Sequence, residues 1–212
     1  MKIISKIIII FLLMAFPIKD YAQKFSNFHW LEVWWVATHP FIAKKTWKIS
    51  EQSREIANSY IKSNELDGDY NGGMVDAFRH TLWMASLVQE IKPKAAYKLG
   101  LAHEKGNKAD FDKKLLEEGK LPDSTSCEMD LRNNYVGIEI GQEYYGESLD
   151  TLILVVKNAV KTGRCWKIKK DSLGNFLDQN GNFIPESQWK GKWITPKVLV
   201  PSDFPRPKMQ KN

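Results

Sequence analysis

Apolar side chains recur every three or four residues along most of the chain, which is the spacing of an amphipathic helix. Four stretches keep this spacing over several turns: Ser50–Ser63, Met74–Ile91, Glu128–Tyr145 and Ser148–Lys161. Pro93 can begin a further helix that Gly106 should end, and a short helix near 110–118 is compatible with the polar segment that follows. The pattern predicts a mainly α-helical, single-domain bundle.

The pattern changes after Gly163. Short pieces of extended character, separated by Gly-Asn and Asn-Gly pairs, span 165–169, 175–177, 182–185 and 189–194. Such pairs favour the tight turns of β-hairpins. We therefore expect a helical domain over 23–164, a β-hairpin extension of the same domain over 165–200, and a disordered, proline-containing tail over 201–212.

The first 22 residues have the layout of an export signal. Two lysines precede an apolar run from Ile7 to Ile18, which is shorter than the roughly 20 residues that cross a bilayer. We expect cleavage after Ala22, with no stable transmembrane anchor, and release into the periplasm or the medium. Asp20 stands where a small residue is preferred, so a retained anchor is the alternative.

Residues 28–47 are apolar and rich in tryptophan. The segment holds Trp30, Trp34, Trp35 and Trp47. One interpretation is a segment that touches lipid, because tryptophan favours the headgroup region of a membrane. The other is burial in the helical core, and the absence of a basic polar face favours it.

The charge of the chain does not indicate a nucleic-acid partner. The formal net charge is +6, and removal of residues 1–22 would take away three lysines and one aspartate, leaving +4. The densest basic cluster, at 167–170, is short, so we interpret the excess as a contribution to solubility. No partner protein is indicated either.

The chain has two cysteines, Cys127 and Cys165. In an exported protein two such residues can form a disulfide, which would contribute roughly 3 to 4 kcal/mol by closing the intervening loop. Two free thiols are the alternative. The C-x-x-C spacing of redox and zinc-ribbon sites is absent.

The loop at 64–73, NELDGDYNGG, is rich in turn-forming residues. Its aspartates give it a superficial similarity to a calcium-binding loop. It lacks the glutamate that would close such a loop, so we expect a turn here and no calcium site.

Two histidines lie in strong helical segments beside carboxylates. Asp76 precedes His80 by four residues, so the two side chains meet on one helix face, and Arg79 lies three residues from Asp76. His103 is followed by Glu104 on the next helix. Three more polar residues come one helix later: Asp130, Asn133 and Asn134.

Histidine and carboxylates on packed helices are a recurrent way to bind a divalent metal ion inside a bundle. The candidate ligands are His80, His103, Asp76 and Asp130, and we expect the two histidines to bind together with Asp76 or Asp130. Zinc is the first choice, and it would activate water for hydrolysis of an unknown substrate, either an anionic compound or a cell-envelope component. Glu104 would transfer the proton and Arg79 would hold an anionic group such as phosphate, with Asn134 as the third member of the catalytic set.

Two other interpretations stay open. In the first, the same side chains form a buried polar network in a non-catalytic envelope protein, with Asp76 orienting His80 and Arg79 paired with Glu104 or Asp130. In the second, a metal-free glycosidase uses Glu104 as general acid and Asp130 as its partner. The sequence has no HExxH motif, nucleophile elbow or glycine-rich phosphate loop that would decide between them.

Three motifs, in order, resemble one family. They are Asp76-Ala-Phe-Arg-His80-Thr-Leu-Trp83, Ala102-His103-Glu104 and Met129-Asp130-Leu-Arg-Asn133-Asn134-Tyr-Val-Gly137. The segment 70–145 is similar to an uncharacterised helical domain of unknown function in secreted bacterial proteins, some of them toxin-like. The resemblance implies that the motif residues form one site or one network, and it supplies no reaction. The family pattern has a histidine where this chain has Arg132, which removes one candidate ligand.

Overall fold

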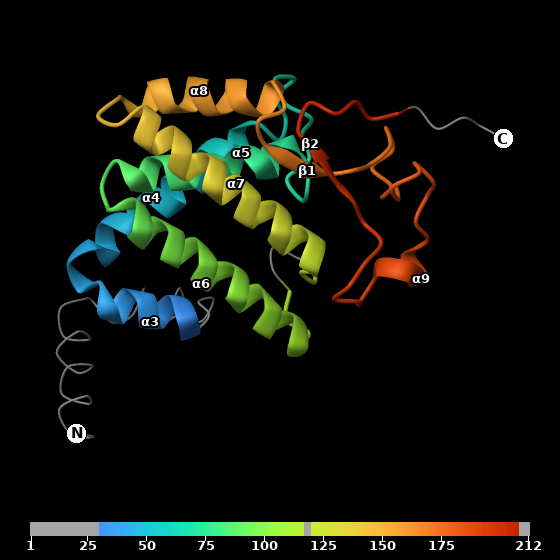
Figure 1. Ribbon diagram of the computed structural model, residues 1–212, viewed down its shortest axis with the longest axis horizontal. Helices are drawn as coiled ribbons and strands as arrows, with labels where there is room; N and C mark the ends of the chain where they lie inside the picture. Colours follow the sequence, from blue (N-terminus) through green and yellow to red (C-terminus); the bar gives the residue numbers. More distant parts are fainter. Residues whose placement is uncertain (1–29, 117–119, 208–212) are drawn as a thin grey trace.

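The computed structural model describes residues 30–116 and 120–207, so the predicted export signal and the last five residues fall outside the described part. Helices dominate the fold (Figure 1). They are α3 (Trp30–Thr38), α4 (Pro40–Ser59), α5 (Met74–Val88), α6 (Pro93–Asp112), α7 (Ser124–Glu143), α8 (Leu149–Lys161) and the short α9 (Glu186–Trp189). Two short strands, β1 (Trp166–Ile168) and β2 (Leu199–Pro201), complete it. The predicted mainly α-helical fold with a small β appendage is confirmed.

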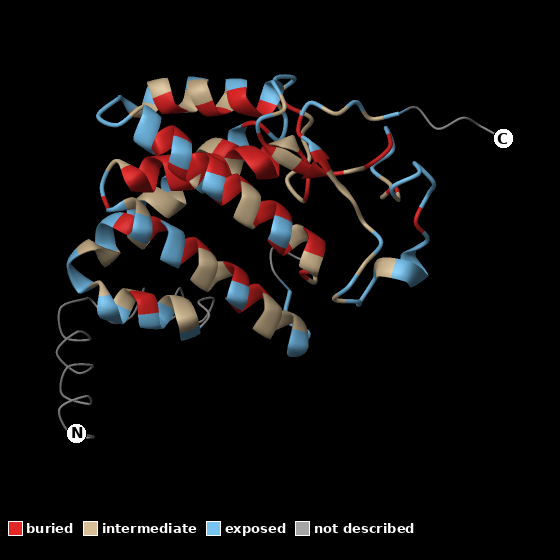
Figure 2. Ribbon diagram, viewed as in Figure 1, coloured by how far each residue is buried: buried red, intermediate tan, exposed pale blue. Residues whose placement is uncertain are grey.

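Helix α5 forms the centre of the core. It packs against α4, α6, α7 and α8, and Phe78 and Leu82 on it are fully buried. Burial of such side chains contributes about 1.5–3 kcal/mol each. Buried residues continue along α5, whereas the outer helices alternate between buried and exposed positions (Figure 2). A helix that is apolar on most sides belongs in the interior, so the polar residues that α5 does carry lie in the middle of the molecule.

Glycines allow α7 to approach α5 very closely. A Cβ atom added to Gly137 would lie 2.3 Å from the Thr81 carbonyl oxygen, and one added to Gly141 would lie 2.7 Å from the Ala85 carbonyl oxygen. Such distances are far below van der Waals contact, so the two backbones could not pack this way with any larger residue. Small residues on this face of α7 thus admit a second helix at close range.

Three helix boundaries differ from the expectation. Helix α4 begins at Pro40, which fits the first turn because proline has no N–H to satisfy there. Helix α6 continues through the buried Gly106 to Asp112, so neither the stop at Gly106 nor a separate helix near 110–118 is correct. Helix α7 begins earlier than predicted because Asp123 caps it and forms a reciprocal capping box with Ser126.

The β appendage pairs distant segments. Strand β1 runs antiparallel to β2, with Lys167 opposite Val200, and the two are linked by about 30 residues. Isolated bridges, Lys170 with Phe176 and Leu177 with Phe183, lie between them. The segment 189–194 was expected to be extended, but its first residue, Trp189, is the last residue of α9. The β content was therefore predicted correctly, but the pairing of neighbouring pieces was wrong for β1 and β2.

The chain after β2 is held as far as Pro207 by contacts with α8, with the loop before α5 and with Ser172. Ser202 is fully buried, and its hydroxyl donates a hydrogen bond of 2.7 Å to the carbonyl oxygen of Val160. Arg206 forms ion pairs of 2.8 and 2.9 Å with Asp67 and Asp69. The prediction of a disordered tail is therefore wrong for 201–207.

Side-chain cations hold the loop at 64–73, whose sequence superficially resembles a calcium site. The carboxylate of Asp69 accepts hydrogen bonds from Lys170 and Arg206, and Lys170 also donates to the carbonyl oxygen of Asn71. The two side-chain cations stand beside the carboxylates where a calcium ion would be expected. Lys170 has a side chain only 4% exposed, so part of the basic cluster at 167–170 serves this loop and does not face solvent.

Cys127 and Cys165 are both buried and are not joined by a disulfide, so that prediction is wrong. The thiol of Cys165 instead lies 3.5 Å from the hydroxyl of Thr81. Burial raises the pKa of Cys165 to about 11, which keeps the thiol protonated at neutral pH and poorly reactive.

The tryptophan-rich start contributes to both the core and the surface. Trp35 is buried and its indole N–H donates to the carbonyl oxygen of Ala95, whereas Trp30 and Trp34 are exposed. In the part of the chain that the structure describes, no helix combines the length and apolar character needed to cross a bilayer.

Candidate metal site

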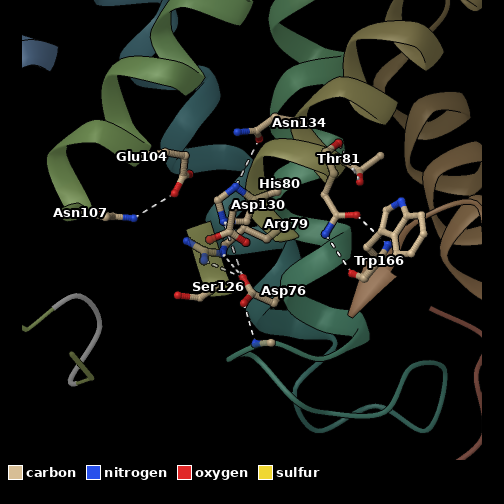
Figure 3. A network of polar contacts seen from close by, with 12 residues as sticks. Asp76, Arg79, His80, Thr81, Glu104, Asn107, Ser126, Asp130, Asn134 and Trp166 are labelled. Carbon is tan, nitrogen blue, oxygen red and sulfur yellow. Dashed lines mark hydrogen bonds and ion pairs between the residues drawn. The ribbon is translucent and has the colours of Figure 1, made fainter. Parts of the chain in front are cut away.

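Three side chains of the predicted cluster converge between α5 and α7 (Figure 3). His80 Nε2 lies 3.4 Å from Asp130 Oδ1 and 3.7 Å from Asp76 Oδ1. All three residues are buried, and one donor atom from each lies within 4.8 Å of the others. Bonds of about 2.1 Å to a tetrahedral zinc ion would place neighbouring donors about 3.4 Å apart, so these spacings suit such an ion.

The hydrogen bond at Nδ1 of His80 decides whether Nε2, the ring nitrogen that faces the carboxylates, carries a proton or a lone pair. His80 Nδ1 lies 3.3 Å from the side-chain oxygen of Asn134, an acceptor, which favours the tautomer with its proton on Nδ1. Nε2 then directs a lone pair at the two carboxylates. It forms no hydrogen bond with the described residues, although it is completely enclosed. A lone pair facing two carboxylate oxygens is repulsive unless a cation lies between them.

Burial also keeps His80 uncharged. Loss of hydration, followed by the nearby charges of Arg79 and His103, holds the pKa of His80 well below its usual value, although its hydrogen bond with Asn134 opposes the shift. A neutral imidazole is the form that binds a metal ion. The ring is therefore ready for coordination at neutral pH without losing a proton first.

The carboxylate of Asp76 is held in place from two sides. The backbone N–H of Gly72 donates to Oδ2 over 2.7 Å, and Arg79 donates to Oδ1 through Nη2 over 2.6 Å and through Nε over 3.2 Å. Such outer contacts orient metal ligands and are a regular part of metal sites. Gly72 belongs to the loop that Lys170 and Arg206 hold, so the C-terminal segment supports the site through this loop.

A small cavity borders the cluster. Its volume is about 60 Å³, room for about two water molecules. Asp76, Arg79 and Asp130 line it from the helices, and Phe176 and Lys197 line it from the C-terminal extension. A larger cavity of about 460 Å³ lies at the other end of α5, near Val88 and Pro93, and none of the three cluster residues lines it.

The structure does not bring every predicted residue to the cluster. The His103 ring centre lies 6.3 Å from that of His80, and its Nδ1 is 3.0 Å from a carboxylate oxygen of Glu32. Glu104 is buried on α6, where it accepts a hydrogen bond from Asn107 (Figure 3). Neither belongs to the group of three donors found among the described residues.

Two other polar residues of the motifs on α7 face elsewhere. The amide of Asn133 binds both backbone groups of Trp166, so it pairs with β1 much as a neighbouring strand would. Arg132, which stands where the family pattern has histidine, pairs with Glu128 and lies over the ring of Trp166. This position therefore contributes to the surface of α7 and not to the cluster.

Sequence reasoning missed the residues that close the cavity from outside the motifs. Lys197 is nearly buried and forms an ion pair of 2.6 Å with Asp123, the capping residue of α7. Loss of hydration lowers the pKa of Lys197, although Asp123 opposes the shift. Asp123 is a residue type that often caps helices, so the sequence contained a signal for it, whereas nothing in the local sequence marked Lys197.

A family model matches residues 33–164, and its description is a domain of unknown function, DUF6973. The chain belongs to this family. No curated protein and no solved structure matches the chain. The resemblance to an uncharacterised domain is confirmed, and the match extends beyond 70–145 on both sides. The DUF6973 segment contains the three candidate ligands, whereas Phe176 and Lys197 lie outside it.

Proposed function

We propose that this DUF6973 protein holds one divalent metal ion, with zinc as the first candidate, between Asp76, His80 and Asp130. We further propose that the site hydrolyses an anionic substrate, and that the protein works outside the cytoplasm, as its N-terminal sequence pattern predicts. The observation that carries the proposal is the enclosed Nε2 of His80, which faces two carboxylate oxygens and has no hydrogen bond among the described residues.

The chain's own residues would perform three tasks. Asn134 holds the His80 ring with Nε2 turned to the two carboxylates, where it would bind the ion, and Gly72 with Arg79 orients Asp76. Zinc bound at such a site lowers the pKa of a coordinated water molecule to about 7. The small cavity beside Asp76 and Asp130 can hold that water. We assign no direct role to Glu104, because its carboxylate is held on α6 beside Asn107.

The charges around the cavity favour an anionic substrate. Its lining contains three carboxylates and three cations: Asp76, Asp123, Asp130, Arg79, Lys120 and Lys197. These formal charges cancel, so a divalent ion would leave an excess of two positive charges. A phosphate or carboxylate group would balance this excess, and Arg79 is the cation that already contacts a ligand side chain.

The rival interpretation is a purely structural network without catalysis. The contacts of Asp76 with Arg79 and of His80 with Asn134 fit both interpretations. A purely structural network should, however, also include a hydrogen-bond partner for Nε2 of His80, because a buried polar atom without a partner costs about 1–3 kcal/mol. The described residues provide none. A metal ion at this position satisfies Nε2 and both carboxylates together.

Metal content and hydrolysis test the proposal together. Elemental analysis of the purified protein should find about one zinc or other divalent ion per chain, lost in His80→Ala. His103→Ala is the matched control, because it removes a neighbouring imidazole that is not in the ligand group. Chromogenic phosphate esters should be hydrolysed by the wild type and His103→Ala, and a chelator should stop the reaction.

Two results would contradict the proposal. A wild-type protein without metal that also fails to take up zinc would exclude the metal site. A metal-loaded protein that hydrolyses no ester, amide or glycoside in a broad panel would keep the site and reject the hydrolase.

A further inference from the structure

We propose that α3 and the first turns of α4 form a membrane-docking face that binds an anionic lipid surface. We call it the aromatic face and define it by Trp30, Val33, Trp34 and Phe41. The side chains of Trp30, Trp34 and Phe41 are 63%, 64% and 99% exposed. Exposed aromatic residues this close together in the sequence are unusual on a soluble surface and mark interaction sites.

Helical spacing gathers three of these residues on one side of α3. Positions 30, 33 and 34 follow each other around one face of the helix. The opposite face is anchored, because Trp35 is buried and its N–H donates to Ala95 near the start of α6. Trp35 therefore attaches one side of α3 to the core, and the aromatic side chains of Trp30 and Trp34 are exposed on the other side.

The charges that share the helical spacing of Phe41 on α4 match an anionic bilayer. Phe41 is followed on α4 by the exposed lysines Lys44, Lys45 and Lys48, of which Lys45 pairs with Glu90. Glu32 is the only acidic residue between positions 30 and 48, and its side chain is 12% exposed and turned to His103. The exposed groups are thus aromatic and basic, a combination typical of helices that lie at a lipid surface.

The structure differs here from the expectation of no basic polar face in 28–47. Lys44 and Lys45 of that segment, with Lys48, are exposed on α4, whereas the one carboxylate, that of Glu32, turns inward. A lipid surface also fits better than a second copy of the chain. Tryptophan concentrates at the headgroup level of membranes, and a nine-residue helix offers little area for a stable dimer.

A retained apolar run ending at Ile18, which is the alternative to cleavage after Ala22, would favour the same occupant. It lies twelve residues before Trp30, so a chain that retains it holds α3 within about 40 Å of a bilayer. The docking face does not depend on the metal site, since it shares no residue with the ligand group.

Vesicles with brominated acyl chains test the proposal in the full chain, because bromine quenches only tryptophans that enter the bilayer. Residues 1–29 contain no tryptophan, so an N-terminal anchor alone gives no quenching. Brominated phosphatidylglycerol vesicles should quench the wild type, and Trp30→Phe with Trp34→Phe should remove most of this quenching. Lys44→Glu with Lys48→Glu should weaken binding by at least about fivefold for each lysine.

Leu173→Ser with Ile194→Ser is the matched control, since both side chains are equally exposed apolar residues in the C-terminal extension. This variant should be quenched like the wild type. Absence of quenching in the wild type, or quenching that the Trp30→Phe and Trp34→Phe changes leave intact, would overturn the proposal. Self-association without lipid that these changes abolish would also overturn it and assign the face to a second copy.

Discussion

His80 is enclosed by protein and stays uncharged, yet one of its two ring nitrogens forms no hydrogen bond with the described residues. Buried polar atoms in folded proteins nearly always have a partner, and exceptions point to a function or to a bound ion. The carboxylates of Asp76 and Asp130 beside this nitrogen also indicate a bound cation, because they add negative charge next to its lone pair. The chemistry of this single residue is therefore the strongest indication of a metal ion.

Asn134 should control metal affinity without binding the metal. Asn134→Ala removes the oxygen that fixes the His80 tautomer, so zinc affinity should fall about 10- to 100-fold, as measured by calorimetric titration. The folded structure should persist, because the ligands themselves are unchanged.

Its neighbour Asn133 gives the matched control. Asn133→Ala removes two hydrogen bonds to Trp166 and should lower the free energy of unfolding by about 1–3 kcal/mol, with zinc affinity unchanged. If the two variants lost affinity equally, the role assigned to Asn134 would be wrong.

At the scale of elements, the site depends on the close packing of α5 and α7. His80 lies on α5 and Asp130 on α7, and the glycines at 137 and 141 bring the two backbones together. The distance between the ligands is thus set by residues that contact no metal.

Gly137→Ala should disturb both stability and the site. The added methyl group would meet the Thr81 carbonyl oxygen and Met84, so the helices must separate, at a cost of about 1–3 kcal/mol in thermal or denaturant unfolding. Zinc affinity should fall as well. Glu139→Ala on the exposed side of α7 is the control and should change stability by about 0.5 kcal/mol or less. A Gly137→Ala protein as stable as the control would show that the helices can adjust freely.

The helices, the pairing of Asp76 with His80 and the small-residue face of α7 could be predicted because each rests on spacing within one helix. The motif that begins at Met129 allowed Asp130 to be predicted as a member of the cluster with Asp76 and His80. The exclusion of His103 could not be predicted, because it depends on how α6 is rotated and on Glu32, 71 positions away. The partner of β1 and the order of 201–207 also depend on contacts between distant segments, which local patterns do not encode.

At the scale of the whole molecule, the C-terminal extension holds the loop before α5 and closes one side of the cavity. Lys170 and Arg206 bind the aspartates of this loop, and the loop's Gly72 orients Asp76. The extension lies outside the DUF6973 match, although it lines the cavity beside the three candidate ligands.

Lys170→Met should therefore destabilise the fold strongly. It removes the buried cation from Asp69, which keeps its ion pair with the more exposed Arg206, and it removes the hydrogen bond to the Asn71 carbonyl oxygen; together these losses should cost about 3 kcal/mol in the free energy of unfolding measured with denaturant. Lys190→Met breaks a pair in which the lysine is 68% exposed, and it should cost about 1 kcal/mol or less. Equal effects of the two changes would contradict the proposed role of the extension.

A crystal structure of the zinc-soaked protein, with anomalous differences measured on both sides of the zinc absorption edge, tests the central claim most directly. The metal site predicts one strong peak about 2.1 Å from His80 Nε2 and from one carboxylate oxygen each of Asp76 and Asp130. Full-strength zinc peaks elsewhere, with none between these three side chains, would contradict it.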